Sequence, residues 1–487
     1  MSYLLLILFP IAMSASAFLL RKQTQFVALA AIATALTELA LVSTVPVDEP
    51  ARLLGMTMVL DPLSRLFLVA FAVIAMVAFA ASIWLPHGEN FAPIGLILLS
   101  FTNATLLLLQ EPFVVALLLI SGAVLAVLAI VDLPTGSPLL VGKKSLAAAL
   151  KYLVLMVIAG VMMYFAYVLV NIYEDTGTSQ SFTTAQLILA LFAVGFGLRL
   201  ALVPFHSWLP DMTEIAAPMV SMIIITVINA TSLLVLISTL QFFGPIILSG
   251  NDMGVQVFQV LGIATCVAGA GLALAQPSLR RMLGYLIAYD AGMIMYGLTT
   301  MSSIGLAGAI FETFNQLVVV ALLFLSLALL EQPDGRPSNV ARRDLLRRWP
   351  IAGVGFLVGG LALIGLPPFN GFASKLLIYQ AAAQDTLPAA LPLLLLSTVL
   401  ALLALGKVAY ERLLGPSEDE PVEESPLLLG EINLDQLAPR KLSPEPRGLA
   451  ALVVVLVAAC LVIGIYPQPV LATINDVIQG LTFIRAL

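Results

Sequence analysis

The chain has 487 residues, of which 61% are apolar and only 10% are charged, and its formal net charge is −6. Soluble domains carry about 25% charged residues. This composition, with a mean hydropathy of +1.06, therefore excludes a soluble globular protein and indicates an integral membrane protein. The long unbroken apolar runs also exclude a transmembrane barrel, whose strands alternate polar and apolar residues over about 10 positions.

We expect an all-α integral membrane protein with about fourteen transmembrane helices, because each span needs about 20 apolar residues. In chain order, the predicted spans are residues 3–20, 26–45, 59–85, 93–109, 112–131, 148–171, 183–207, 216–242, 254–275, 281–300, 304–330, 350–372, 388–410 and 448–468. Basic residues concentrate in the cytoplasmic loops of membrane proteins. With the N-terminus outside, nearly all loop Lys and Arg residues face the cytoplasm, and only Arg52 and Arg485 lie in outer segments.

One hydrophilic segment separates the last two spans. Residues 411–447 hold nine of the 28 acidic residues and are rich in proline. Such a composition favours disorder in this cytoplasmic linker. The alternative is a strap that docks onto a partner subunit.

Motifs for nucleotide, metal and haem chemistry are missing from the sequence. It contains no GxGxxG or Walker motif, which would indicate nucleotide binding. His87 and His206 are the only histidines, too few for a haem or zinc site within the chain. Cys266 and Cys460 lie in apolar spans without CxxC spacing, so we expect small core residues. We therefore expect no metal and no cofactor in this chain.

Two segments interrupt apolar spans in the same way. Residues 202–218 read LVPFHSWLPDMTEIAAP, and residues 365–375 read GLPPFNGFASK. Broken helices in corresponding positions of two halves are the best indication from sequence of an ion pathway in a transporter. Irregular backbone at membrane depth must be buried in protein or line a wet cavity. The predicted breaks lie at Pro204, Pro210, Pro367 and Pro368.

The first break carries a charge and several polar side chains. Arg199 cannot lose its proton in a protein, so it would act as a fixed charge in the pathway or as a structural bridge between helices. His206 titrates near neutral pH, which makes it a candidate relay at the mouth of the pathway or a cap that fixes the break. Asp211 and Glu214 would line the cytoplasmic end of this break.

The second half carries the stronger set of candidates for proton transfer. Lys375 follows the second break, and a desolvated lysine can exchange protons; the alternative is a lysine that reaches the membrane interface. Glu312, Asn315 and Gln316 share one helix face at i, i+3 and i+4 spacing. Asp290 lies in the preceding span and, like Glu312, is either a relay or a satisfied buried acid.

Several of these segments resemble those of a known family. LRLALVPFHSWLPDMTEIAAP and GLPPFNGFASK resemble spans 7 and 12 of the antiporter-like membrane subunits of respiratory complex I, and LDPLSRLFL resembles the start of their span 3. LRRMLGYLIAYDAGMIMYGL and FNQLVVVALLFLSLALL are similar to their spans 10 and 11, so the resemblance covers residues 59–375. It implies two inverted five-helix repeats, spans 4–8 and 9–13, with discontinuous helices 7 and 12. The same fold serves Mrp-type antiporters and membrane-bound hydrogenases.

The resemblance also assigns residues and shows departures. In the family, a span-7 lysine takes the place of Arg199, and the span-12 charge matches Lys375. The span-5 glutamate of the family should fall within Ile120–Gly122, where this chain has no acid. Its span-8 lysine should fall near Asn229 and Thr231, which offer only polarity. A carboxylate for Arg199 would then have to come from a neighbouring subunit or from Glu38, which we otherwise interpret as structural or facing lipid.

Span 11 departs as well, with Glu312 in place of a histidine and Val320 in place of a lysine. The resemblance divides the chain into a three-helix segment (1–92), two antiporter-like repeats (93–242 and 254–410), the acidic linker (411–447) and a C-terminal helix with its tail (448–487).

The hypothesis from sequence is an antiporter-like subunit of a complex I-related, redox-driven ion pump. It would conduct protons through a midplane chain of Arg199, Lys375, Glu312, Asp290 and His206. The alternatives are an Mrp-type sodium/proton antiporter subunit and a degenerate structural subunit that conducts nothing. The resemblance implies sister antiporter-like subunits and a hydrophilic redox arm as partners, which would carry any iron–sulfur cluster, flavin or quinone. We expect the cytoplasmic membrane of a bacterium or archaeon and no nucleic acid.

Overall fold

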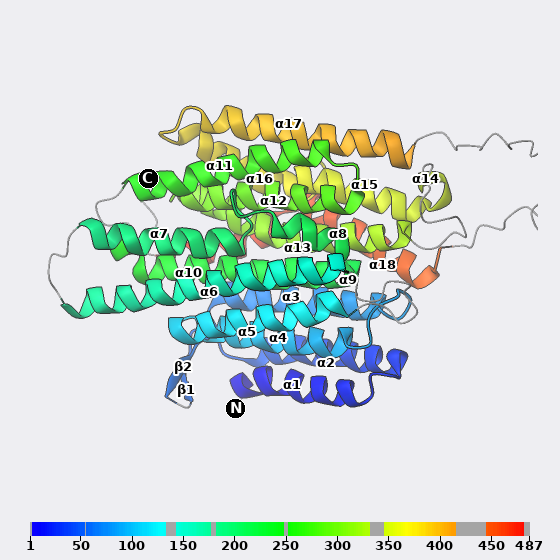
Figure 1. Ribbon diagram of the computed structural model, residues 1–487, viewed down its shortest axis with the longest axis horizontal. Helices are drawn as coiled ribbons and strands as arrows, with labels where there is room; N and C mark the ends of the chain where they lie inside the picture. Colours follow the sequence, from blue (N-terminus) through cyan, green and yellow to red (C-terminus); the bar gives the residue numbers. More distant parts are fainter. Residues whose placement is uncertain are drawn as a thin grey trace, which may run out of the picture.

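The computed structural model describes residues 2–53, 55–132, 143–176, 182–247, 252–331, 345–414 and 445–481. Its helices run side by side with nearly parallel long axes (Figure 1). Within the described ranges, ten helices are long and apolar enough to cross a membrane, and three shorter apolar helices accompany them. The expected all-α integral membrane fold is confirmed, while the count of fourteen spans stays a prediction. The acidic linker lies almost entirely outside the described residues.

The N-terminal segment contains three long helices and a short hairpin. Its elements are α1 (Ser2–Leu19), α2 (Thr24–Thr44), β1 (Ala51–Leu53), β2 (Met56–Met58) and α3 (Pro62–Ala81). The two strands pair antiparallel, with Ala51 opposite Met58. Asp61 caps α3, since its side chain accepts a hydrogen bond from Ser64 N at 2.7 Å, the usual role of an N-cap acid. The hairpin was not predicted from the sequence.

The first half follows, with one interrupted helix and one π-helical turn. Its elements are α4 (Phe91–Leu107), α5 (Pro112–Val131), α6 (Lys143–Thr176), α7 (Phe182–Arg199), α8 (Trp208–Ile215), α9 (Pro218–Ile223), η1 (Ile224–Asn229) and α10 (Ala230–Ile247). Helix α9 continues through η1 into α10 as one apolar segment, and a π-helical turn of this kind often lies at a functional site.

The second half repeats this pattern. Its elements are α11 (Asp252–Ala275), α12 (Leu279–Thr299), α13 (Ser303–Leu330), α14 (Leu345–Arg348), α15 (Pro350–Ile364), α16 (Gly371–Gln384), α17 (Ala390–Val408) and η2 (Ala409–Leu413). The last described elements are α18 (Arg447–Ile465) and α19 (Gln468–Ile478). Helix α19 lies in the tail, where no element was predicted.

The two helix breaks have closely similar backbones. Helix α7 stops at Arg199, and Ala201 then adopts a positive φ of 56°. Helix α15 stops at Ile364, and Gly365 adopts a positive φ of 89°. Each break also contains a cis proline peptide, at Pro204 and at Pro368. The predicted discontinuity of both helices is confirmed.

One predicted break residue has a different place. Pro210 lies inside the first turn of α8 and not in the irregular segment before it. Proline is tolerated there, because the first backbone N–H groups of a helix have no intrahelical acceptor. The first break is therefore shorter than its proline spacing suggested.

The most buried helices lie at the centre of the bundle. Helix α9, η1 and the first part of α10 are buried almost throughout, as are 89% of the residues in the most apolar 18-residue stretch of α13, against 28% in the corresponding stretches of α1 and α18. Figure 1 shows α13 in the middle of the bundle, with α1 and α17 at opposite edges. The polar residues of α13 are thus surrounded by protein, where membrane proteins place functional polar groups.

Close contact between α11 and α12 depends on glycine. A Cβ atom on Gly269 would lie 2.7 Å from the backbone N of Tyr289, and one on Gly292 would lie 2.7 Å from the backbone N of Cys266. Small residues let transmembrane helices approach closely. This packing fixes the position of α12, which carries Asp290.

Candidate functional site

A buried lysine and two buried carboxyls meet beside the second helix break. Lys375 lies one turn after the start of α16, and its Nζ atom contacts Asp290 on α12 and lies 2.5 Å from Glu312 Oε1 on α13. None of the three side chains is more than 2% exposed. We call Lys375, Asp290 and Glu312 the lysine triad. The alternative that Lys375 reaches the membrane interface is wrong.

The break itself supplies another partner for the lysine. The last carbonyls of a helix lack intrahelical partners, and α15 ends at Ile364. Leu363 O, one of these carbonyls, accepts a hydrogen bond from Lys375 Nζ at 2.7 Å. The ammonium group thus lies at the negative end of the α15 dipole, where a cation is favourable. Interruption of the helix therefore creates a buried cation site.

Side chains of α13 and α16 complete the hydrogen bonding of the triad. Gln316 Nε2 donates to Asp290 Oδ2 at 3.0 Å. Ser374 Oγ donates to Glu312, and Asn315 Nδ2 donates to Ser374 Oγ at 2.9 Å. The predicted shared face of Glu312, Asn315 and Gln316 is confirmed, and all three point toward the break and its neighbours.

The triad can carry one more negative charge than positive charge. Lys375 as an ammonium group balances one carboxylate, and the described residues give neither Asp290 nor Glu312 another ion pair. A net charge without a partner is costly in a buried, low-dielectric place. One proton bound to the triad removes that charge. The arrangement is thus suited to hold and release a proton.

A row of hydroxyls begins beside the triad. Lys375 Nζ lies 5.4 Å from the ring centroid of Tyr289, a cation–π distance. Tyr289 OH lies 3.0 Å from Thr398 Oγ1, which lies 2.6 Å from Tyr379 OH. Hydroxyls can both donate and accept, so this row extends the polar network from α12 to α17.

The first break carries a buried arginine without a carboxylate. Arg199 is the last residue of α7 and is 1% exposed. Its Nε donates to Ser232 Oγ at 2.9 Å, and its Nη1 donates to Leu119 O at 3.4 Å. Its Nη2 has no hydrogen-bond partner among the described residues. Both contacts support the structural bridge between α5, α7 and α10, and neither supplies a counter-charge.

Glu38 does not pair with Arg199. Its side chain is buried in α2, and its Oε1 accepts a hydrogen bond from Asn103 Nδ2 of α4 at 3.1 Å. The same Nδ2 also donates to Leu6 O of α1 at 3.0 Å. The alternative that Glu38 faces lipid is wrong, because only 1% of it is exposed. Glu38 joins the first helices of the bundle to α4.

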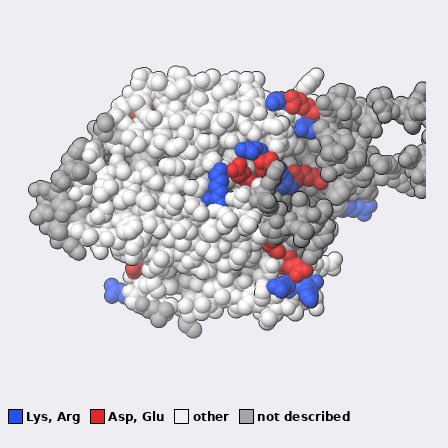
Figure 2. Space-filling view, in the orientation of Figure 1, with Lys and Arg blue, Asp and Glu red and all other residues white. Residues whose placement is uncertain are grey.

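The polar residues that follow the first break form ion pairs. Asp211 pairs with Lys151 of α6 at 2.7 Å and with Arg281 of α12 at 3.2 Å. Arg281 also pairs with Glu214 at 3.2 Å. Figure 2 shows charged side chains gathered where α8 lies in Figure 1, whereas most of this face carries none. These contacts fasten α8 to both halves of the chain.

His206 lies beside one of those ion pairs, because Lys151 Nζ also donates to the carbonyl of the next residue, Ser207 O, at 3.1 Å. Its ring centroid is 6.0 Å from that of Tyr285 on α12. Its Nδ1 atom is buried and has no hydrogen-bond partner among the described residues. The two interpretations of His206, a proton relay and a cap of the break, both stay predictions.

The two polar residues predicted for the first half lie at the junction of η1 and α10. Thr231 lines a hollow of about 20 Å³ together with Arg199. Its Oγ1 donates to Val227 O at 2.6 Å within its own helix. Asn229, the last residue of η1, does not line this hollow. The structure therefore brings only one of the two beside Arg199.

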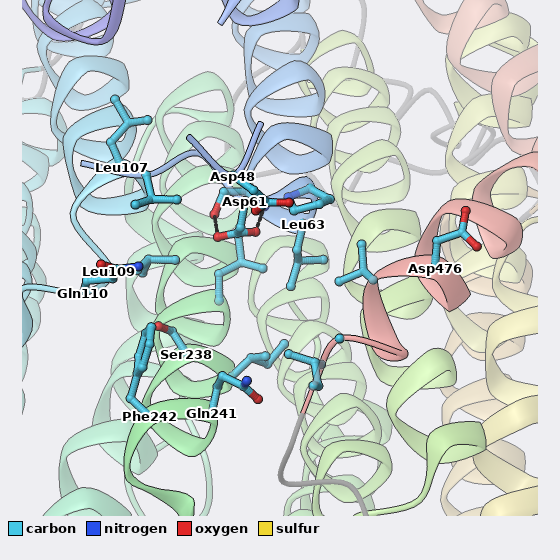
Figure 3. Close-up of a pocket in the computed structure, with 18 residues that line it drawn as sticks. Asp48, Asp61, Leu63, Leu107, Leu109, Gln110, Ser238, Gln241, Phe242 and Asp476 are labelled. Carbon is cyan, nitrogen blue, oxygen red and sulfur yellow. Dashed lines mark hydrogen bonds between the residues drawn. The ribbon is translucent and has the colours of Figure 1, made fainter. Parts of the chain in front are cut away.

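A larger cavity lies at the end of the bundle where α3 begins. Its volume is about 450 Å³, and Asp48, Asp61 and Asp476 are among the residues that line it. Figure 3 shows its labelled side chains coming from the segment after α2, the start of α3, the end of α4 and the residues that follow it, α10 and α19. Burial raises the pKa of Asp61 above its ordinary value, although Ser64 donates hydrogen bonds to it. The sequence contains no signal for this cavity, because its lining comes from five separate segments.

Sequence reasoning missed two further polar contacts. Asn370 in the second break donates to Asn315 Oδ1 at 3.2 Å. At the far end of α16, Asp385 accepts hydrogen bonds from Tyr296 OH at 2.6 Å and Gln259 Nε2 at 3.1 Å. The first contact could have been anticipated, because Asn370 is a polar residue within the proline-containing break that precedes Lys375. The second depends on three helices that sequence spacing does not relate.

No cluster of three or more His, Cys, Asp or Glu side chains suited to a metal ion occurs within the described ranges. Cys266 and Cys460 are both buried and free, which confirms their predicted core positions.

Sequence comparisons relate more than half of the chain to a known family. The sequence model of the family described as "NADH:quinone oxidoreductase/Mrp antiporter, TM" matches residues 138–401. A protein assigned as antiporter subunit mnhD2 in Staphylococcus aureus (strain JH9) is 30% identical over 254 residues, 51% of this chain and 49% of the relative. The chain therefore spans about half the length of the curated relatives it matches.

Two solved structures share the fold. A chain of the Mrp complex from Dietzia sp. DQ12-45-1b has a TM-score of 0.81 and 20% sequence identity, covering 99% of this chain and 97% of that one. A chain of respiratory complex I from Thermus thermophilus with bound NADH has a TM-score of 0.76 and 20% identity, with full coverage of both chains. At this identity the likeness concerns the fold alone.

Proposed function

The chain belongs to the NADH:quinone oxidoreductase/Mrp antiporter transmembrane family, and on that premise we propose that this antiporter-like subunit conducts protons through its second half. The observation that carries the proposal is the lysine triad. It joins one ammonium group and two carboxyls in a place that solvent does not reach. The triad can bind or release one proton and so change its net charge. A purely structural ion pair would need only one carboxyl to balance the ammonium group.

The pathway we propose passes through polar groups on both sides of the triad. Gln316 and Asn315 hold the carboxyl groups and the break in place, while Tyr289 leads toward Thr398 and Tyr379. Water admitted at the break would complete the chain, since irregular backbone at this depth lines a cavity or is buried. His206 would act at the mouth of the first half.

The two halves make unequal contributions in this proposal. Arg199 keeps its charge at every accessible pH and has no carboxylate partner among the described residues, so it cannot relay a proton. It would instead set the electrostatic potential of the first half. Residues 93–242 and 254–410 would be inverted repeats of one ancestral unit, which the positive φ just after the end of α7 and of α15 supports.

The partners of the subunit follow from the same proposal. Other antiporter-like membrane subunits would flank it, and a hydrophilic redox arm would supply the energy. The subunit would lie in the cytoplasmic membrane of a bacterium or archaeon with its N-terminus outside. The ion pairs around Asp211 would then face the cytoplasm, and the cavity beside Asp61 would open toward the outer side.

A second candidate function is sodium/proton exchange in an Mrp-type assembly. The relative from Staphylococcus aureus carries an antiporter name, and the Dietzia neighbour belongs to an Mrp complex. Sodium dependence of transport in vesicles, together with the subunits that co-purify, separates the two assemblies. Redox subunits in the purified complex support the first function, and their absence with sodium-dependent exchange supports the second.

The proposal is tested by replacing Lys375 with methionine in the assembled complex. Proton translocation is measured with a pH-sensitive dye in proteoliposomes. We expect Lys375→Met to lose proton translocation while the complex still assembles. Lys407→Met is the matched control, because Lys407 is only partly buried and donates to a backbone carbonyl, Leu274 O, at 3.1 Å. Translocation at the control's rate in the Lys375→Met complex would refute the proposal.

A further inference from the structure

The hollow beside Arg199 presents an unusual combination of charge and space. It lies between α4, α5 and the start of α10, and Gly122, Thr102, Thr105 and Thr231 line it with the arginine. Arg199 is 99% buried, and its Nη2 atom has no hydrogen-bond partner among the described residues. A permanent cation thus borders this small hollow, and one of its N–H donor atoms has no acceptor among the described residues.

The charge of Arg199 needs compensation that the described residues do not provide. Its two contacts are a serine hydroxyl and a backbone carbonyl, Ser232 Oγ and Leu119 O. Both are neutral, and a guanidinium group cannot become neutral by losing its proton. A buried charge without an opposite charge is strongly unfavourable. A water molecule would satisfy the free N–H but would leave the charge uncompensated.

The size of the hollow limits what can bind. Its volume of about 20 Å³ is close to the 10–15 Å³ that a single water needs. Phosphate and sulfate are therefore too large, whereas a monatomic anion fits. The hydroxyls of Thr102, Thr105 and Thr231 donate to carbonyls of their own helices, and a hydroxyl hydrogen can rotate toward a new acceptor.

We propose that the hollow is a halide site, in which a chloride ion bound to Arg199 Nη2 supplies the counter-charge of the first half. This inference is independent of proton conduction by the second half. It assigns a ligand to a position where the chain has a glycine and no acid, and it explains how a buried arginine is tolerated there.

Gly122 offers a direct test of this assignment. A Cβ atom added at Gly122 meets no atom within 4 Å, and Gly122 lies one turn after Leu119, whose carbonyl already contacts Arg199. The variant Gly122→Glu would therefore place a carboxylate in the hollow. It should replace the chloride ion, so that the protein no longer depends on chloride.

The experiment measures the unfolding midpoint of the purified full-length protein in detergent. Chloride, bromide and gluconate are compared at equal sodium concentration. We expect chloride and bromide to raise the midpoint of the wild-type protein by a few degrees in a saturable way, relative to gluconate. Arg199→Gln should lose this difference. Gly122→Glu should show in gluconate the midpoint that the wild-type protein reaches in chloride, with no further rise on adding chloride.

Two results would overturn the proposal. One is an equal midpoint of the wild-type protein in chloride and gluconate, which would mean that the hollow holds water only or a carboxylate of a partner subunit. The other is an undiminished chloride effect in Gly122→Glu, which would place the halide elsewhere. If Arg199→Gln does not fold, Gly122→Glu still decides the question, and an anomalous bromide peak beside Arg199 in crystals gives an independent readout.

Discussion

Removal of Lys375 from the triad has a predictable energetic cost. The ammonium group contacts Asp290, lies 2.5 Å from Glu312 Oε1 and is excluded from solvent. Truncation of one partner of a buried ion pair costs about 3–5 kcal/mol, because the other charge is left uncompensated. We therefore expect Lys375→Met to lower the free energy of unfolding by that amount.

A second substitution distinguishes charge from packing. In Lys375→Met/Glu312→Gln, only Asp290 is left as an acid, and Gln316 still donates to it at 3.0 Å. The double variant should therefore be more stable than Lys375→Met alone, with a coupling energy of about 0.5–3 kcal/mol, the range for groups in contact.

The assay is denaturant unfolding of the purified protein in detergent micelles, followed by tryptophan fluorescence. Lys407→Met serves as the control, and it should cost at most about 1.5 kcal/mol, as for one hydrogen bond. Additive effects of Lys375→Met and Glu312→Gln would refute the reasoning, because the two residues would then not share one electrostatic site.

Two further predictions concern the fold around the site. Gly269→Val should destabilise the protein by about 1–3 kcal/mol through overpacking, since a Cβ atom there lies 2.7 Å from Tyr289 N. In Gly271→Ala the added Cβ meets no atom within 4 Å, so this variant should stabilise the protein by about 0.5–1 kcal/mol. Equal effects of the two variants on the free energy of unfolding would contradict this packing. Asp61→Ala should lower the free energy of unfolding by about 0.5–2 kcal/mol, because it removes the cap of α3. Asp61→Asn should lower it less, because the amide oxygen still accepts the hydrogen bond from Ser64 N. A large loss of stability in both variants would assign Asp61 another role.

The sequence predicted much of the fold, because hydropathy and proline mark transmembrane helices and their interruptions. The predicted span 112–131 coincides with α5 (Pro112–Val131), and 304–330 differs from α13 (Ser303–Leu330) by one residue. The small elements escaped this reasoning. A three-residue strand or an eleven-residue surface helix such as α19 has no 20-residue apolar signal.

The candidate site could be predicted only in part. Lys375, Glu312 and Asp290 stood out because ionised residues are rare in transmembrane segments. Their mutual contact could not be predicted, since it depends on packing between α12, α13 and α16. Leu363 O could not be found either, because a backbone carbonyl becomes a ligand only where a helix stops.

The partner of Glu38 shows the limit of reasoning from charge alone. A buried carboxyl and a buried arginine in one chain suggest a pair, yet Glu38 contacts Asn103 instead. An amide side chain is uncharged, so it is overlooked when only opposite charges are considered as partners. Its N–H groups nevertheless donate hydrogen bonds to a buried carboxyl.

The central claim is that buried carboxyls of the second half conduct protons, whereas Glu38, the buried carboxyl of the N-terminal segment, does not. It is tested most directly by measuring proton translocation of the assembled complex in proteoliposomes with Glu312→Gln and with Glu38→Gln. Both substitutions replace a glutamate that is 1% exposed with its neutral isostere. We expect Glu312→Gln to abolish translocation and Glu38→Gln to retain it. Normal translocation in the Glu312→Gln complex, or its loss only in the Glu38→Gln complex, would contradict the account.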